Sequence, residues 1–167
     1  IALVTGWSMA GCQSYQWAAQ YPNMVKAILP FCASSKTSIH NYVFLEGIKA
    51  ALITDKSWNN GNYKKQPVVG LKSFGRVYAG WAFSQDFYRK KLYKKFGFKS
   101  ADDLLDDWAS DHEKNWDAND LLSKLKTWQL NNISNGPLYR GNYIKALRSI
   151  RAKTILMPCN QDLYFRT

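Results

Sequence analysis

A serine stands between small residues near the start of the chain, in the stretch GWSMAG around Ser8. The apolar run Ile1–Val4 precedes this stretch, and a helical pattern follows it. Small residues, here Gly6 and Ala10, are needed where a chain turns sharply from a strand into a helix, because a larger side chain would collide with its neighbour. Such a turn lifts a serine hydroxyl clear of the sheet and aims backbone N–H groups at a bound molecule. The pattern is typical of a nucleophilic serine.

A carboxylate that could serve this serine comes much later in the chain. A serine hydroxyl is a poor nucleophile until a base takes its proton, and that base is usually a histidine oriented by a carboxylate. Asp162 lies just past a third apolar run, Lys153–Pro158. Because the carboxyl ends of parallel strands meet at one edge of a sheet, Asp162 is expected near Ser8. On position alone, a surface turn residue is an equally good interpretation of Asp162.

The remaining residues with metal-binding or redox chemistry show no site pattern. His112 opens the stretch HEKNW, which lacks the second histidine of a zinc-protease helix, and the other histidine is His40. The three cysteines have spacings that fit neither a disulfide framework nor a metal site: Cys12, Cys32 and Cys159. Free buried thiols are therefore expected, in agreement with a reducing cytoplasm, and no metal is expected.

Composition and charge limit the class of protein. With 46% hydrophobic residues in 167, the chain can bury a core and is not a disordered tail. No apolar run approaches the roughly 20 residues that a membrane helix requires. The net charge of +11 includes one basic run, Arg89–Phe96, which could touch nucleic acid or an anionic surface. A solvated helix face with Leu92, Tyr93 and Phe96 turned inward is the favoured interpretation, so neither nucleic acid nor a membrane is expected as a partner.

Three short apolar runs are expected to position the serine and the acid. Ile1–Thr5, Val25–Leu29 and Thr154–Pro158 are typical of strands covered on both faces. The first two, with the helix Ser14–Gln20 between them, have the size of a right-handed βαβ crossover. We predict that the three strands are parallel neighbours in one sheet, with Ser8 at the carboxyl end of the first.

A long helical segment interrupts this sheet. Helical patterns cover Asn41–Leu52, Leu71–Phe83, Lys99–Asp111 and Ala118–Leu130, with Ser100 as an expected N-cap, and Tyr143–Ile150 leads back to the sheet. The expected organisation is an α/β core over residues 1–37, a helical cap over 38–141 and a return to the core over 142–167. Five of the seven tryptophans fall in the cap, which suits a roof over a binding site, although simple packing also explains them.

Taken together, these stretches resemble the homoserine O-acetyltransferase branch of the α/β-hydrolase superfamily, over nearly the whole chain. GWSMAGCQSYQWAAQYPNMVKAIL is similar to the nucleophile elbow and its helix, and HNYVFLEGIKAALITDKSWNNGNY to the first cap segment. GLKSFGRVYAG resembles the cap helix that carries a substrate-binding arginine, here Arg76. WDANDLL and IRAKTILMPCNQDLYF resemble a later cap helix and the acid-bearing strand.

The resemblance implies an α/β-hydrolase fold and a Ser-Asp-His triad that works by double displacement. Ser8 would take an acyl group, acetyl by the family's name, from acyl-CoA and pass it to the hydroxyl of a small-molecule acceptor. Asp162 would orient the histidine, the backbone N–H of Met9 would form half of the oxyanion hole, and Arg76 would hold a carboxylate of the acceptor. Acyl-CoA would be a co-substrate, with no bound cofactor. A cytoplasmic location and a homodimer through the cap are also expected.

Departures from the family pattern leave other functions open. Ala10 stands where the family has glycine, and Gly80 or a neighbour stands where the family has a histidine. In the family the triad histidine follows the acid, whereas both histidines of this chain precede Asp162, so the chain is expected to be an inactive part of a larger enzyme. The alternatives are a serine esterase, with water as the acceptor, and a catalytically inactive fragment or scaffold that binds an anionic partner.

Overall fold

The computed structural model describes residues 1–165 and divides into two compact units. The first unit joins residues 1–38 to the chain from Trp128 onward, and the second is residues 39–127. The sequence places the end of the cap at residue 141, whereas residues 128–141 group with the first unit. Backbone and side-chain hydrogen bonds explain this grouping, since Ile133 N donates to Ser35 O at 3.1 Å and Asn131 Nδ2 donates to Ser34 O at 3.1 Å.

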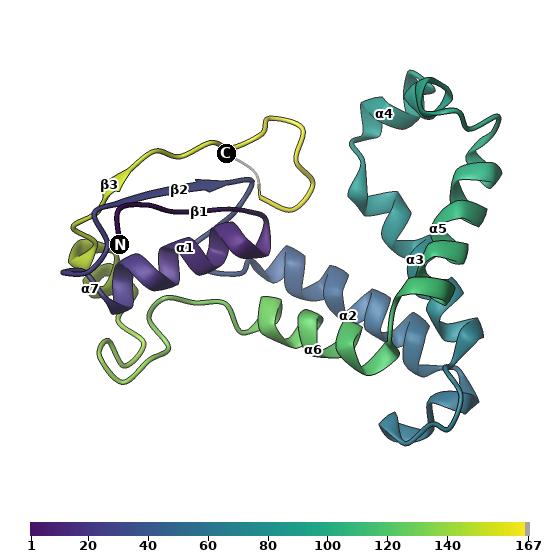
Figure 1. The fold of residues 1–167 in the computed structure, drawn as a ribbon, viewed down its shortest axis with the longest axis horizontal. Helices are drawn as coiled ribbons and strands as arrows, with labels where there is room; N and C mark the ends of the chain where they lie inside the picture. The colour runs from purple at the N-terminus through teal and green to yellow at the C-terminus, as the bar shows by residue number, and fades with distance from the viewer. Residues whose placement is uncertain (166–167) are drawn as a thin grey trace. The chain divides into compact units, whose positions relative to one another are not determined.

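Three parallel strands form the sheet of the first unit, in the order β1-β2-β3 (Figure 1). They are β1 (Val4–Trp7), β2 (Ala27–Phe31) and β3 (Lys153–Thr154). The predicted arrangement of three parallel neighbours is therefore confirmed. The crossover between the first two strands is α1 (Met9–Gln20), as a βαβ unit requires.

The strand boundaries differ from the prediction because the hydrogen-bond register, and not the apolar run, sets them. The ladder of β1 begins at Val4 opposite Ile28, three residues later than predicted, and continues through Gly6 and Trp7. β3 is only two residues long, yet the chain after it still follows β2, since Met157 N donates to Pro30 O at 3.3 Å. The predicted coverage on both faces is wrong for this segment, because Met157 and its two preceding residues are exposed.

Helix α1 starts immediately after Ser8, five residues earlier than predicted. Ala10 and Gly11, which the prediction left in the turn before the helix, belong to the first turn of the helix. The helix lies very close to the sheet at this point. A Cβ atom at Gly11 would lie 2.5 Å from the Cβ of Ala33 and 2.8 Å from the carbonyl oxygen of Gly6. Farther along, Ala18 and Ala19 of α1 are fully buried.

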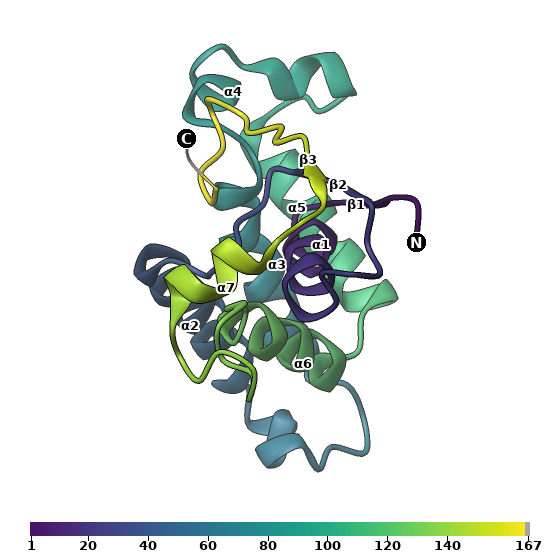
Figure 2. The same ribbon diagram turned by 90° about the vertical axis from the view of Figure 1, so that its left-hand side faces the viewer.

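One side of the sheet carries two helices (Figures 1 and 2). Ala18 of α1 packs with Val25 and Ile28, which places α1 on β2. The short helix α7 (Tyr143–Ser149) packs beside it, through Ala146 against Ala19. This core fixes the position of the turn that contains Ser8.

The second unit is helical throughout. Its elements are α2 (Ile39–Ile53), η1 (Lys56–Gly61), α3 (Val68–Ala82), α4 (Gln85–Arg89), η2 (Leu92–Phe96), α5 (Ala101–Asn115) and most of α6 (Ala118–Gln129). Helix α3 packs against both α2 and α5 and buries Leu71 and Phe74. Ser100 caps α5 as predicted, because its Oγ accepts from Asp103 N at 3.0 Å. Within residues 1–165, no helix has the length and apolarity to cross a membrane.

Gly75 permits the close packing of α3 on α5. This contact predicts how an alanine at position 75 changes the stability of the protein. A Cβ at Gly75 would lie 2.5 Å from the backbone oxygen of Trp108, so Gly75→Ala should destabilise the protein by about 1–3 kcal/mol through overpacking. Gly80, on the same helix, has nothing within 4 Å of the added methyl group. Gly80→Ala should therefore stabilise the protein by roughly 0.5–1 kcal/mol. Urea unfolding of both variants checks the pair, and equal effects would contradict the close contact.

The basic run does not form the single helix face that the sequence favoured. It spans the end of α4 and η2, and two left-handed residues enclose η2: Lys91 at φ 51° and Gly97 at φ 93°. Tyr93 is buried as predicted. Phe96 is 71% exposed, so its predicted inward position is wrong. The left-handed residues interrupt the helical period that would have turned this ring toward the interior.

Candidate active site

Ser8 occupies the sharp turn between β1 and α1. Its φ of 57° and ψ of −123° lie in a region that a non-glycine residue adopts only at a cost in energy. Two backbone hydrogen bonds hold it there: Ser8 N donates to Phe31 O at 3.1 Å, and Cys12 N donates to Ser8 O at 3.0 Å. The backbone holds Ser8 at the carboxyl end of β1, where the sequence placed it.

Space around this turn explains the small residues of the motif. A Cβ at Gly6 would lie 2.5 Å from the Cβ of Ala10 and 2.6 Å from its backbone oxygen. The methyl group of Ala10, the position where the resembling family has glycine, itself points to solvent and is accommodated. Gly6 and Gly11 are thus the positions that must lack a side chain, and Ala10 is compatible with the turn.

The N-terminus of α1 supplies hydrogen-bond donors next to Ser8. Met9 is the first residue of the helix, and N–H groups in a first helical turn have no carbonyl partner within the helix. The first turn contains no acidic side chain that would occupy them. The aligned peptide dipoles add a partial positive charge at this end. An oxyanion formed on an acyl group bonded to Ser8 would meet this positive end.

Asp162 lies in a tight loop that its own side chain holds in place. Its backbone N–H donates to Cys159 O at 3.1 Å. Its Oδ1 accepts from two backbone N–H groups, those of Tyr164 at 2.7 Å and Phe165 at 3.0 Å. Both of these hydrogen bonds go to Oδ1.

Ser8 and Asp162 are both tied to the carboxyl end of β2. The Ser8 N–H bonds to Phe31, and the next residue, Cys32, donates its N–H to Met157 O at 3.0 Å, at the start of the Asp162 segment. Burial raises the pKa of the Cys32 thiol, and the negative charge of Asp162 raises it further. Asp162 thus lies close enough to the Cys32 thiol to act on its pKa, and the backbone hydrogen bonds hold Ser8 and the start of the Asp162 segment at the same end of β2.

Cys32 is a residue of this edge that the sequence motifs did not single out. The carboxyl ends of parallel strands meet at one edge of a sheet, which is why Asp162 was expected at this edge. The same reasoning applies to Cys32, because Cys32 directly follows the last residue of β2. Its φ of 47° shows that the chain turns away sharply at this point. A cysteine without metal or disulfide spacing gave no motif of its own.

Arg76 already has a carboxylate partner within the chain. Its Nη2 forms an ion pair with Asp106 Oδ1, between α3 and α5, and both side chains are exposed. Exposed pairs of this kind contribute about 0–1 kcal/mol, so a ligand carboxylate can displace one. Ser8 and Asp162 belong to the first unit, and Arg76 belongs to the second.

The two histidines lie in the helical unit. His112 is buried, and its Nδ1 donates to Trp108 O at 2.8 Å. Its ring stacks between Trp108 and Trp116, at centroid distances of 5.9 and 6.2 Å. His112 therefore packs α5. His40 is exposed, with its ring 5.1 Å from that of Trp81.

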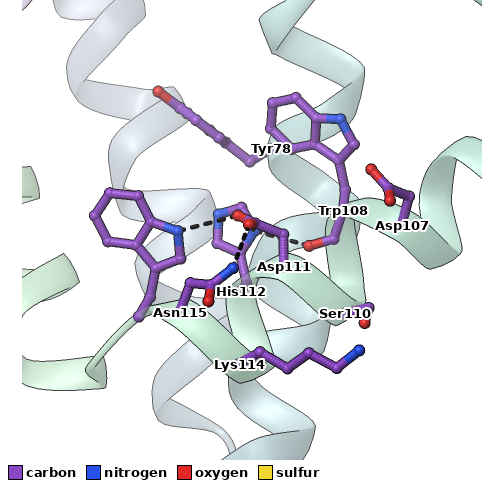
Figure 3. Close-up of a pocket in the computed structure, with 9 residues that line it drawn as sticks. Tyr78, Asp107, Trp108, Ser110, Asp111, His112, Lys114 and Asn115 are labelled. Carbon is purple, nitrogen blue, oxygen red and sulfur yellow. Dashed lines mark hydrogen bonds and ion pairs between the residues drawn. The ribbon is translucent and has the colours of Figure 1, made fainter. Parts of the chain in front are cut away.

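A pocket of about 440 Å³ lies beside α5, within the helical unit (Figure 3). Its polar side chains are bonded to one another, since Asp111 accepts from Asn115 Nδ2 at 2.8 Å and from Trp116 Nε1 at 3.1 Å. None of the predicted site residues lines it. Over residues 1–165, no cluster of three or more His, Cys, Asp or Glu side chains is arranged to hold a metal ion.

Sequence comparison finds relatives with acyl-group chemistry, although no family model matches the chain. An ethyl acetate hydrolase from Pseudomonas veronii is 32% identical over 99% of this chain and 47% of its own length. A homoserine O-acetyltransferase from Carboxydothermus hydrogenoformans is 26% identical over 100% of this chain and 47% of its own length. The chain thus spans about half the length of the curated relatives it matches.

Solved structures of the same two kinds share the fold. The acetyl esterase MekB matches with a TM-score of 0.92 and 31% identity, over 98% of this chain and 48% of its own. A homoserine O-acetyltransferase from Bacillus anthracis matches with a TM-score of 0.82 and 26% identity, over 98% of this chain and 46% of its own. The likeness extends across both units of the chain.

Proposed function

Because this chain belongs to the homoserine O-acetyltransferase-like family of the α/β-hydrolase superfamily, we propose that the protein cleaves small acyl esters through a covalent ester on Ser8 and releases the acyl group to water. The observation that carries the proposal is the backbone of Ser8, which is held in a strained conformation between a parallel strand and a helix N-terminus. That turn is typical of a nucleophilic serine.

The first half of the proposed reaction forms the ester on Ser8. The Ser8 Oγ attacks the acyl carbon while a histidine takes its proton, and the Met9 N–H donates to the developing oxyanion. The C–O bond to the alcohol then breaks, and the alcohol leaves with the proton from the histidine. Asp162 orients that histidine. In the family's order the histidine follows Asp162, an order that neither His40 nor His112 meets.

The second half returns the enzyme to its starting state. The histidine takes a proton from the acyl acceptor, the acceptor oxygen attacks the ester carbon, and Ser8 Oγ leaves with the proton. With water as the acceptor, the product is a carboxylic acid. The relatives named as an ethyl acetate hydrolase and an acetyl esterase support water as the acceptor and an acetyl group as the acyl group.

Acyl transfer from acyl-CoA to an acceptor hydroxyl is the second candidate. The homoserine O-acetyltransferase relatives support it, and so does the exposed position of Arg76, since a weak surface pair can exchange Asp106 for a ligand carboxylate. In this reaction acyl-CoA is the co-substrate, and Arg76 holds the acceptor by a bidentate contact.

The two candidates differ in what removes the acyl group from Ser8. The complete protein that contains this chain is supplied with p-nitrophenyl acetate and, separately, with acetyl-CoA, each with and without homoserine or serine. Hydrolysis predicts that p-nitrophenol is released at a rate that the amino acids do not change, with acetate as the product. Arg76→Lys should leave this rate within about twofold, because exposed charge substitutions are usually mild.

Transfer predicts slow CoA release alone and much faster release with one hydroxy amino acid. In that case Arg76→Lys should raise the KM for the acceptor, since lysine cannot form a two-pronged contact. Acceleration by an acceptor, with an acetylated amino acid as the product, would reject water as the acceptor. It would leave the role of Ser8 intact.

A further inference from the structure

The helical unit carries a concentrated patch of positive charge where α4 leads into α5. We call residues 89–99 the basic turn. It has six exposed cationic side chains: Arg89, Lys90, Lys91, Lys94, Lys95 and Lys99. Two carboxylates border this patch, since Lys90 Nζ lies 2.8 Å from Asp86 Oδ2 and the backbone N–H of Lys99 donates to Asp103 Oδ2 at 2.9 Å. The turn stands at the end of its unit, beyond the last turn of α3 and before the first turn of α5 (Figures 1 and 2).

An exposed aromatic ring lies among these charges. Phe96 is 71% exposed, with Lys94 and Lys95 immediately before it in η2. The left-handed residues Lys91 and Gly97 begin and end this short helix, so the three side chains are displayed by a tight turn. A large apolar side chain that is this exposed among lysines contributes little to the core of its own unit.

The base of the basic turn is firmly packed. Phe87 and Tyr93 are buried in one cluster with Leu104 of α5. The Phe87 ring stacks on Phe83 at a centroid distance of 4.1 Å and reaches Phe96 at 6.0 Å. The exposed ring and its lysines therefore stand on a packed aromatic base.

We propose that the basic turn docks the protein on a bilayer surface that carries anionic lipid headgroups. The lysines and the arginine approach the phosphate and carboxylate groups, and Phe96 enters the boundary between headgroups and acyl chains. The combination of both features is what such a surface recognises, because charge draws the turn to the membrane and the ring adds apolar contact. This docking is independent of the chemistry at Ser8 and revises the expectation of no membrane partner.

The shape of the patch favours a bilayer over nucleic acid. Sequence-tolerant sites for single strands are charged grooves with several rings on which successive bases stack. In the basic turn one ring is exposed, while the neighbouring rings of Phe87 and Tyr93 are buried and cannot receive a base. A protruding turn with one apolar tip fits a flat, continuous, negatively charged surface.

Vesicle sedimentation tests the proposal on the complete protein. The protein is mixed with phosphatidylcholine vesicles, with and without phosphatidylserine, at low and at physiological salt. We expect binding that requires phosphatidylserine and weakens with salt. The double variant Lys94→Gln/Lys95→Gln should lower the partition coefficient roughly 25-fold, about fivefold for each charge. Its matched control is Lys64→Gln/Lys65→Gln, which removes the same charge from another exposed segment of the unit and should bind nearly as the parent does.

The contribution of the ring is tested separately. Phe96→Ala should lower the partition coefficient about tenfold, whereas Leu138→Ala, a truncation at an exposed site in the first unit, should not change it. The side chains replaced in the two lysine double variants, in Phe96→Ala and in Leu138→Ala are all exposed. Circular dichroism should therefore show that these four variants fold like the parent. Ser8→Ala should bind vesicles normally, which separates this test from that of the proposed function.

Four results would overturn the proposal. Equal binding with and without phosphatidylserine would exclude headgroup recognition. Equal losses in the two lysine double variants would show only a bulk effect of the net charge. Normal vesicle binding by Phe96→Ala, or a loss of binding to single-stranded RNA but not to vesicles in Lys94→Gln/Lys95→Gln, would exclude bilayer docking by the basic turn.

Discussion

Ser8→Ala is expected to abolish ester cleavage by the complete protein, with a loss of about 10⁶ in kcat if the serine acts as the nucleophile. The substitution removes one oxygen and with it the atom that forms the covalent ester. The bonds that hold the turn use the backbone N–H and carbonyl of residue 8, which alanine keeps. The fold should therefore survive, and the loss should be in chemistry.

Steady-state hydrolysis of p-nitrophenyl acetate measures this loss, and circular dichroism verifies the fold. Ser14 offers a control in the same helix, because its Oγ donates to Ala10 O at 3.1 Å and its side chain is fully buried. Ser14→Ala should lower stability slightly and leave kcat within a few-fold of the parent. Normal turnover by Ser8→Ala would show that another group is the nucleophile.

Asp162→Asn is expected to lower kcat by about 10⁴, the loss seen when the orienting carboxylate of a serine triad becomes an amide. The amide oxygen can still accept from the N–H groups of Tyr164 and Phe165, so the loop should keep its shape. What is lost is the negative charge that holds the imidazole in the correct tautomer and stabilises its protonated form. Asp107→Asn, an exposed carboxylate in the helical unit, is the control and should have near-normal activity.

Asp162→Asn can also be tested without measuring activity, through the reactivity of the Cys32 thiol. The charge of Asp162 raises the pKa of the Cys32 thiol, after the larger effect of burial. Removing that charge should lower the pKa of Cys32, so more thiolate is present at a given pH. Alkylation of Cys32 by iodoacetamide, followed by peptide mapping, should then be faster in Asp162→Asn than in the parent. An unchanged Cys32 rate, together with unchanged turnover, would contradict the placement of Asp162 at the edge with Ser8.

The order of elements around Ser8 was predictable because the motif and its context agree. Gly6 is small for the reason the sequence suggests, since a helix that follows a strand so abruptly leaves no space for a side chain, whereas the same requirement at Gly11 emerged only from the structure. The rule of strand ends predicted the place of Asp162 at this end of the sheet, but position alone did not separate a triad acid from a surface turn residue. The limits of β1 were not predictable, because the apolar run Ile1–Val4 marks hydrophobicity, whereas the ladder with β2 extends through Thr5, Gly6 and Trp7.

Features that depend on backbone conformation or on partners far along the chain could not be predicted from the sequence. The exposure of Phe96 follows from left-handed residues at Lys91 and Gly97, and a lysine gives no signal for that conformation. The ion pair of Arg76 with Asp106 joins two helices whose register no local pattern reveals. The resemblance to a family gave Arg76 a ligand role without showing this competing carboxylate.

The location of the acyl group during turnover is the most direct test of the account. The complete protein is mixed with p-nitrophenyl acetate, quenched in acid during the steady state, digested and mapped by mass spectrometry. We expect an acetyl group on Ser8 in the parent and none at this position in Ser8→Ala. Continued turnover with no acetyl group on Ser8, or an acetyl group on another residue that accumulates and decays at the turnover rate, would contradict it.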